Sequence, residues 1–130
     1  MPFVEAARQR ARQLPAGDAT RVLLDYMLAH AVGVQNARSW NAIQAELHEN
    51  DIRMSKEQFQ QTILAETRRG QIWIGSTDHG RRRGYFLIQD HGDAMTARNF
   101  IADRIAAQQA NLNNLDQLIQ IQWPPGAQAQ

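Results

Sequence analysis

The side chains with the clearest chemical potential lie between positions 56 and 83. A glutamine side chain makes a bidentate pair with adenine, lysine or arginine contacts guanine, and glutamate accepts a hydrogen bond from cytosine. Arginines also neutralise backbone phosphates. Residues of these types are Lys56, Glu57, Gln60, Gln61, Arg68, Arg81, Arg82 and Arg83. The set therefore predicts contact with a double-stranded nucleic acid. Both the first turns of one helix and a cluster of arginines are expected to make this contact.

A helix that begins after Ser55 is expected to position the first part of this set. Ser55 is a favoured N-cap residue, and Gln58 stands at the position that completes a capping box. Gly70 is suited to end the helix in the left-handed conformation. Three residues at helical spacing are expected to face the core, namely Phe59, Ile63 and Leu64. The polar residues then fall mostly on the opposite, solvent-facing side.

The three consecutive arginines stand between two segments that favour β-structure. Residues 71–74 and 85–88 are rich in β-branched and aromatic side chains. We expect them to pair as a hairpin whose turn covers residues 75–84. The short link over residues 34–38 also has room for a stub of strand. A helix beside a hairpin with an Arg-rich tip has the parts needed to grip a duplex.

Charge is distributed unevenly along the 130 residues, although the net charge is only +1. Residues 53–88 carry seven basic and three acidic side chains, and residues 1–14 carry three arginines and one glutamate. Residues 15–52 and 89–130 are net acidic. Such segregation is typical of a phosphate-binding face. A solvated surface on which the charges cluster by accident would give the same pattern.

Three segments are expected to precede the helix after Ser55. Residues 1–17 read as a basic N-terminal arm with helical character over residues 4–14. Asp18 or Thr20 caps a core helix, and Ser39 caps the next one. The apolar face of that next helix consists of Trp40, Ile43 and Leu47.

A long helix is expected from Asp93 or Thr96 to about Gln122. Its apolar residues are separated by 4, 7, 3 and 4 positions and are Ile101, Ile105, Leu112, Leu115 and Ile119. This is the a/d spacing of a coiled coil, with Gln108 at the missing position. A polar residue there weakens such a seam but fixes its register. We expect this helix to form a homodimer or to pack back onto the domain.

The order helix, helix, helix, strand, Arg-rich turn, strand resembles small bacterial and phage winged helix-turn-helix proteins. The segments that carry the resemblance within residues 20–105 are LLDYML (23–28), NARSWNAI (36–43), FQQTIL (59–64), RRG (68–70) and GYFLI (84–88). The resemblance implies a mainly α fold with a small β-hairpin. The implied division is a basic arm (1–17), a winged-helix domain (18–92), a C-terminal helix (93–123) and a flexible tail (124–130). The connection over residues 48–54 is longer than the family pattern.

The resemblance also implies a function. In that family the third helix enters the major groove, and the wing lies along phosphates or in the minor groove. It implies a sequence-specific DNA-binding protein, a transcriptional regulator of phage or bacterial type, whose two-fold symmetric dimer suits a palindromic site. Winged helices also serve as protein-docking modules without DNA binding. In that alternative the long last helix is the docking surface. In either case this helix could bind a protein partner.

Other kinds of chemistry are disfavoured. The chain has no cysteine, which excludes disulfides and thiolate metal sites and suits a reducing cytoplasm, where we expect the protein. The Asp-His-Gly triplets at 78–80 and 90–92 have the composition of turns, and no helical His pair or phosphate-binding glycine loop occurs. No apolar run is long enough for a membrane span. We expect no enzymatic activity, no cofactor, no metal and no membrane contact.

Overall fold

The structure is a computed structural model that describes residues 2–69, 72–79 and 82–126, without the side chains at positions 2, 79 and 82. Residue contacts divide the chain into two compact units, residues 1–97 (unit 1) and residues 98–130 (unit 2). Gly70, Arg81 and residues 127–130 of the expected tail lie outside the described residues.

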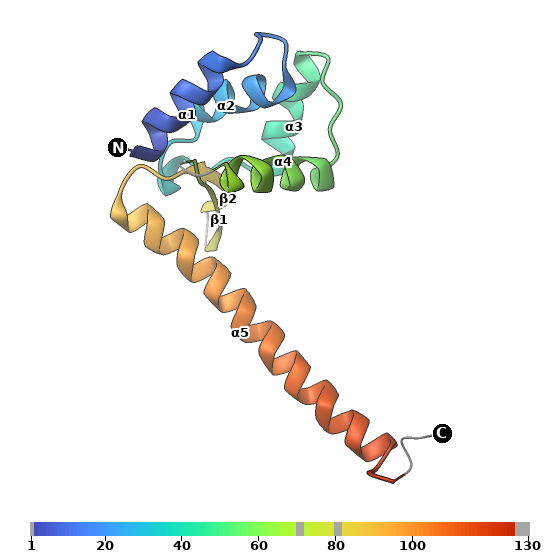
Figure 1. Cartoon of the computed structure of the whole chain (residues 1–130). Coiled ribbons are helices and arrows are strands. Elements are labelled where there is room, and N and C mark those ends of the chain that lie inside the picture. The colour runs from blue at the N-terminus through green and yellow to red at the C-terminus, as the bar shows by residue number, and fades with distance from the viewer. Residues whose placement is uncertain (1, 70–71, 80–81, 127–130) are drawn as a thin grey trace. The chain divides into compact units, whose positions relative to one another are not determined.

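The order of helices and strands confirms the expected fold class. The chain is mainly helical, with one two-stranded antiparallel hairpin and a long last helix. In Figure 1 the elements are α1 (Pro2–Gln13), α2 (Ala19–His30), the 3₁₀ helix η1 (Val34–Asn36), α3 (Trp40–Glu49), α4 (Lys56–Arg68), β1 (Ile74–His79), β2 (Arg82–Leu87) and α5 (His91–Gln122). From α2 to β2 this is the winged-helix order that the sequence predicted.

The helix starts follow the expected local chemistry. Asp18 caps α2, and its Oδ1 accepts hydrogen bonds from the backbone N–H groups of Thr20 and Arg21. Ser39 caps α3 by accepting from the backbone N–H of Ala42 at 3.1 Å. Each cap satisfies backbone donors that a helix N-terminus leaves without a partner. The predicted caps are therefore confirmed where the structure describes them.

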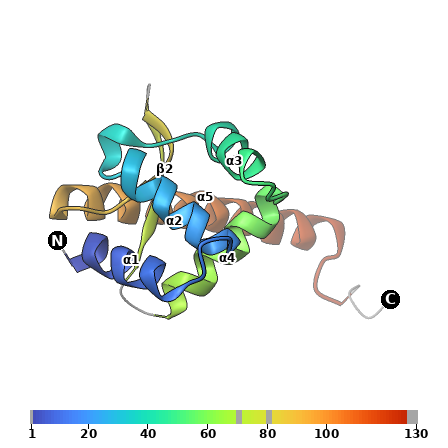
Figure 2. The same ribbon diagram turned by 90° about the horizontal axis from the view of Figure 1, so that it is seen from above.

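The segment expected as a basic arm is folded into unit 1. α1 packs against α2, which also contacts α3 (Figures 1 and 2). Val4, Ala7 and Ala11 recur at helical spacing and are fully or almost fully buried. Burial of this apolar stripe explains why α1 packs on the domain.

The core of unit 1 joins the helices to the hairpin. Its main cluster includes Leu23, Leu24, Met27, Ile43, Leu47, Phe59, Ile72, Ile74 and Leu87. A second cluster is formed by Phe86, Ile88 and Ala97. The first cluster fixes α4 on the domain, and the second ties the end of β2 to the first turns of α5.

The hairpin differs from the prediction in where its strands lie. β1 begins at Ile74 and β2 begins at Arg82, so most of the segment expected as a turn is paired strand. The register places Thr77 opposite Gly84 and Asp78 opposite Arg83. The prediction of a turn over residues 75–84 was wrong, because the Gly, Ser and Asp content of this segment favours turns while antiparallel pairing overrides that preference.

The link before α3, where a stub of strand was expected, is a 3₁₀ turn over Val34–Asn36 followed by a single bridge residue, Arg38. Arg38 and Tyr85 exchange backbone hydrogen bonds of 2.9 and 2.8 Å, which adds one antiparallel bridge to the edge of β2. Gly84 makes this approach possible. It has a φ of 133°, and a Cβ atom there would overlap the carbonyl oxygen of Arg38.

The last helix begins earlier than predicted, at His91 rather than at Asp93 or Thr96. The Asp90 side chain accepts a hydrogen bond from the backbone N–H of Asp93 at 2.8 Å, as an N-cap does. The Asp93 carboxylate is buried and accepts from the backbone N–H groups of Val34 (3.1 Å) and Gln89 (3.0 Å). Asp93 therefore ties the start of α5 to η1 instead of capping it.

Candidate nucleic-acid interface

The start of α4 is held by a complete capping box. The Ser55 hydroxyl accepts from the backbone N–H of Gln58 at 3.1 Å, and the Gln58 side chain accepts from the backbone N–H of Ser55 at 2.9 Å. Because its amide oxygen is engaged in the cap, Gln58 is less available to a ligand than its exposed neighbours. The two hydrogen bonds fix the backbone of the first turn, from which the following positions of α4 continue.

Five of the expected contact residues share one face of α4. Successive residues in an α-helix are about 100° apart, which places these five within an arc of about 140° around the axis. They are Lys56, Glu57, Gln60, Gln61 and Arg68, and all are exposed. The helix thus offers one cation and one carboxylate in its first turn, two amides in the next turn and a second cation in its last turn.

Leu64 lies near the middle of that arc and is 48% exposed. Its predicted place in the core was wrong. Leu64 is five residues after Phe59 and therefore about 140° away around the helix, whereas Ile63 is only about 40° away. Gln60, Gln61 and Arg68 lie three or four positions from Leu64 and therefore on the same side of the helix. These polar neighbours are the sequence signal that would have placed Leu64 on the polar face.

The opposite face of α4 is anchored by aromatic packing. Phe59 is fully buried. The centroid of its ring lies 4.8 Å from that of Trp40 in α3 and 4.8 Å from that of Tyr85 in β2. The contact with Tyr85 is edge-to-face, a favourable geometry for two aromatic rings. Trp40 is thus a packing residue, and one side chain fixes α4 against both the preceding helix and the hairpin.

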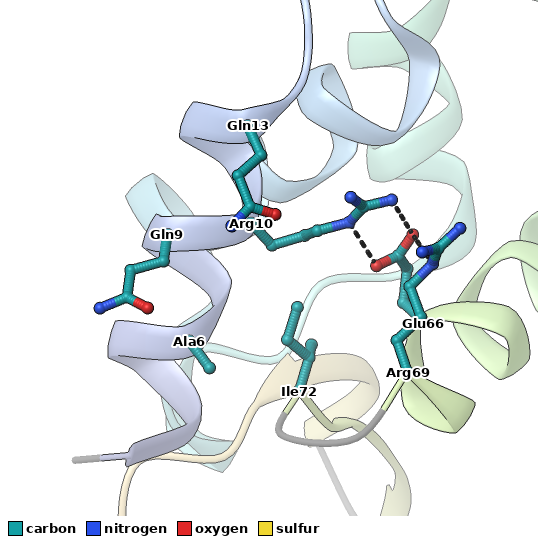
Figure 3. Close-up of a pocket in the computed structure, with 7 residues that line it drawn as sticks. All are labelled: Ala6, Gln9, Arg10, Gln13, Glu66, Arg69 and Ile72. Atoms are coloured by element: carbon teal, nitrogen blue, oxygen red, sulfur yellow. Dashed lines mark hydrogen bonds and ion pairs between the residues drawn. The ribbon is translucent and has the colours of Figure 1, made fainter.

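The last turns of α4 are held by an ion pair with α1, which the sequence did not predict. Arg10 donates through Nε to one carboxylate oxygen of Glu66 at 2.9 Å and through Nη2 to the other at 3.2 Å (Figure 3). This hydrogen-bonded pairing raises the pKa of Arg10 above its usual value. Arg69 approaches the same carboxylate at 3.7 Å. The three side chains line a pocket of 260 Å³ with Ala6, Gln9, Gln13 and Ile72.

The arginines of the hairpin are described in part. Arg83 is exposed, and its backbone pairs with that of Asp78. Arg82 belongs to β2 and pairs with His79, so two of the three residues lie in a strand rather than in a loop. Arg81 lies outside the described residues. The exposed position of Arg83 near the hairpin end leaves its guanidinium accessible to a partner.

In unit 2, α5 exposes the whole of the predicted seam. The seam residues Ile101, Ile105, Leu112, Leu115 and Ile119 are between 39% and 64% exposed. Leu118, Ile121 and Trp123 are also exposed, and they were missed because the heptad template counts only a and d positions. An apolar stripe of this length is typical of an interaction surface.

The residues that the structure describes contain no group of three or more His, Asp or Glu side chains placed to hold a metal ion. None of the described helices combines the length and apolarity needed to cross a membrane. Comparison of the chain with protein-family models, with curated proteins and with solved structures finds no match.

Proposed function

We propose that the chain is a sequence-specific double-stranded DNA-binding protein, a transcriptional regulator of phage or bacterial type that works in the cytoplasm. In this proposal α4 enters the major groove, and the Arg-rich hairpin lies on the backbone or in the minor groove. The single observation that carries the proposal is the exposed polar face of α4 on a helix fixed at both ends. A helix of this kind is rigid enough to hold side chains in register with base edges.

The chemistry of the α4 face supports readout of bases. Gln60 and Gln61 suit adenine, Lys56 suits guanine or a phosphate, and Glu57 suits cytosine. Leu64 adds an apolar group beside the two amides, which suits the methyl group of thymine. The face therefore favours a site with A·T pairs under the middle of the helix.

The hairpin and the helix end support binding to the backbone. Arg68 and Arg83 are exposed, and Arg81 and Arg82 are neighbours of Arg83 in sequence. Each phosphate that they neutralise contributes about 0.9 to the salt dependence of binding to B-DNA. The seam of α5 supports a homodimer, whose symmetry suits two half-sites.

One observation favours the alternative, a protein–protein interaction module without DNA binding. Leu64 and the α5 seam are exposed apolar surfaces, and such surfaces also mark protein-docking sites. In that case the arginines would meet an acidic protein rather than a duplex.

In vitro selection from a random pool of duplexes tests the proposal. The expected result is an enriched motif that is lost with the Gln60→Ala, Gln61→Ala double variant. A matched control is the Gln44→Ala variant, which changes an exposed amide on α3. If selection with the wild-type chain enriches no motif, sequence-specific binding is contradicted.

A further inference from the structure

The seam of α5 has a self-complementary polarity pattern. With Ile105 at an a position, Leu112 and Ile119 are also a residues, and Ile101 and Leu115 are d residues. Between Ile105 and Trp123 the one ionisable side chain is Asp116. Two copies of this face meet without rows of like charge, whereas a strongly charged partner finds almost nothing to pair with.

We infer that a second copy of the chain covers this face as a parallel, in-register coiled coil whose orientation is set by Gln108. The inference deepens the homodimer of the proposed function and rests on it. In the parallel arrangement Gln108 of each chain faces Gln108 of the other in one d layer. Each amide has both donors and an acceptor, so the two side chains can hydrogen-bond to each other.

An antiparallel arrangement sets a residues against d residues and is less favourable for Gln108. In the register that pairs all five seam residues, Gln108 lies opposite Leu112, because the two positions are equally far from Ala110 at the centre. The amide then loses a polar partner within the layer, which is unfavourable when water is excluded. A buried polar residue at one seam position is a known determinant of register and orientation.

The residues that flank the seam agree with the parallel arrangement. In parallel coiled coils a g residue of one chain faces the e residue of the next heptad of the other chain. Leu118 is at g, and Trp123, the first residue after α5, stands where the following e position falls, so two exposed apolar side chains come close to each other. Asn111 meets Asp116 in the same way, which leaves the carboxylate opposite a hydrogen-bond donor.

The absence of cysteine in the sequence makes cross-linking of the full chain a direct test. Gln122→Cys places one thiol at a d position, and Arg98→Cys places one at an a position. These two positions face each other in the antiparallel arrangement, whereas in the parallel one each faces itself. An equimolar mixture of the two variants is equilibrated in a glutathione buffer without DNA, and the disulfides are identified by mass spectrometry. Gln117→Cys, at the outer f position, is the control.

The expected product is the homodisulfide of each seam variant, in about tenfold or greater excess over the mixed disulfide. The Gln117→Cys chain is expected to cross-link far less. A dominant mixed disulfide would overturn the parallel arrangement, and sedimentation of the wild-type chain as a monomer at micromolar concentration would overturn the pairing itself. The Gln108→Leu change is expected to raise the mixed disulfide relative to the homodisulfides, and an unchanged ratio would contradict the role of Gln108. Because no DNA is present, each of these failures would bear on the coiled coil alone. DNA binding is tested separately by the selection experiment.

Discussion

The guanidinium group of Arg10 contacts both carboxylate oxygens of Glu66, at 2.9 and 3.2 Å, and so joins the first helix of the chain to the last turns of α4. The Glu66 side chain is 8% exposed and that of Arg10 is 21% exposed. The pair is thus largely shielded from water. Charge-assisted hydrogen bonds are strong, and shielding from water strengthens them further. It makes α1 part of the support of the candidate DNA-binding helix.

Replacing Arg10 should therefore destabilise the fold. Arg10→Met leaves the buried Glu66 carboxylate with the weaker contact of Arg69 at 3.7 Å, and we expect a loss of about 2 kcal/mol in the free energy of unfolding. The control is Arg12→Met, which changes an exposed arginine of the same helix and should cost less than about 0.5 kcal/mol. Urea denaturation measures both. Equal effects of the two variants would contradict a structural role for the ion pair.

The same pair predicts a pH dependence. The pKa of Arg10 is raised in the folded state, so its contribution to stability is fully present below the ordinary arginine value and is lost only as the pH rises through the folded value. The stability difference between wild type and Arg10→Met should stay constant between about pH 7 and pH 10. Urea midpoints across this range measure it, and a difference that shrinks toward pH 10 would contradict the assignment.

A second prediction concerns the two faces of α4. Phe59→Ala removes a fully buried ring and should cost about 3–5 kcal/mol. Leu64→Ala changes a half-exposed side chain on the other face and should cost less than about 1 kcal/mol. Thermal unfolding of the two variants compares them. A Leu64→Ala loss as large as that of Phe59→Ala would mean that Leu64 belongs to the core after all.

Gly84 provides a test of the bridge between Arg38 and β2. Gly84→Ala places a Cβ on a backbone with a φ of 133° and against the Arg38 carbonyl, so we expect a loss of at least about 2 kcal/mol. Gly17→Ala is the control, because a Cβ there meets nothing within 4 Å. It should be close to neutral. A mild effect of Gly84→Ala in the same thermal assay would argue against the bridge.

The local features of the fold were largely predictable from the sequence. Ser55 with Gln58, Ser39 and Asp18 were recognised because a cap depends on residues only a few positions apart. The strand bounds were not predictable in the same way, since Gly75 and Asp78 favour turns in isolation and become strand only when β2 pairs with them.

The candidate site was predictable in part. The polar residues of α4 were identified by their types and spacing, but Leu64 was assigned to the wrong face because an apolar neighbour of Ile63 was read as a core residue. The ion pair of Arg10 with Glu66 joins residues 56 positions apart. No local pattern links two such residues, so the anchoring of α4 by α1 required the three-dimensional structure.

The central claim is that the polar face of α4 and the arginines of the hairpin bind a DNA duplex. The most direct measurement is fluorescence anisotropy of a labelled duplex, selected as above, over a series of salt concentrations. We compare the wild-type chain with the Arg81→Ala, Arg82→Ala, Arg83→Ala triple variant. The wild type should bind with a steep salt dependence, and the triple variant should bind more weakly with a slope reduced by about 2–3. Absence of binding by the wild type at about 50 mM salt, or an unchanged slope in the variant, would contradict the claim.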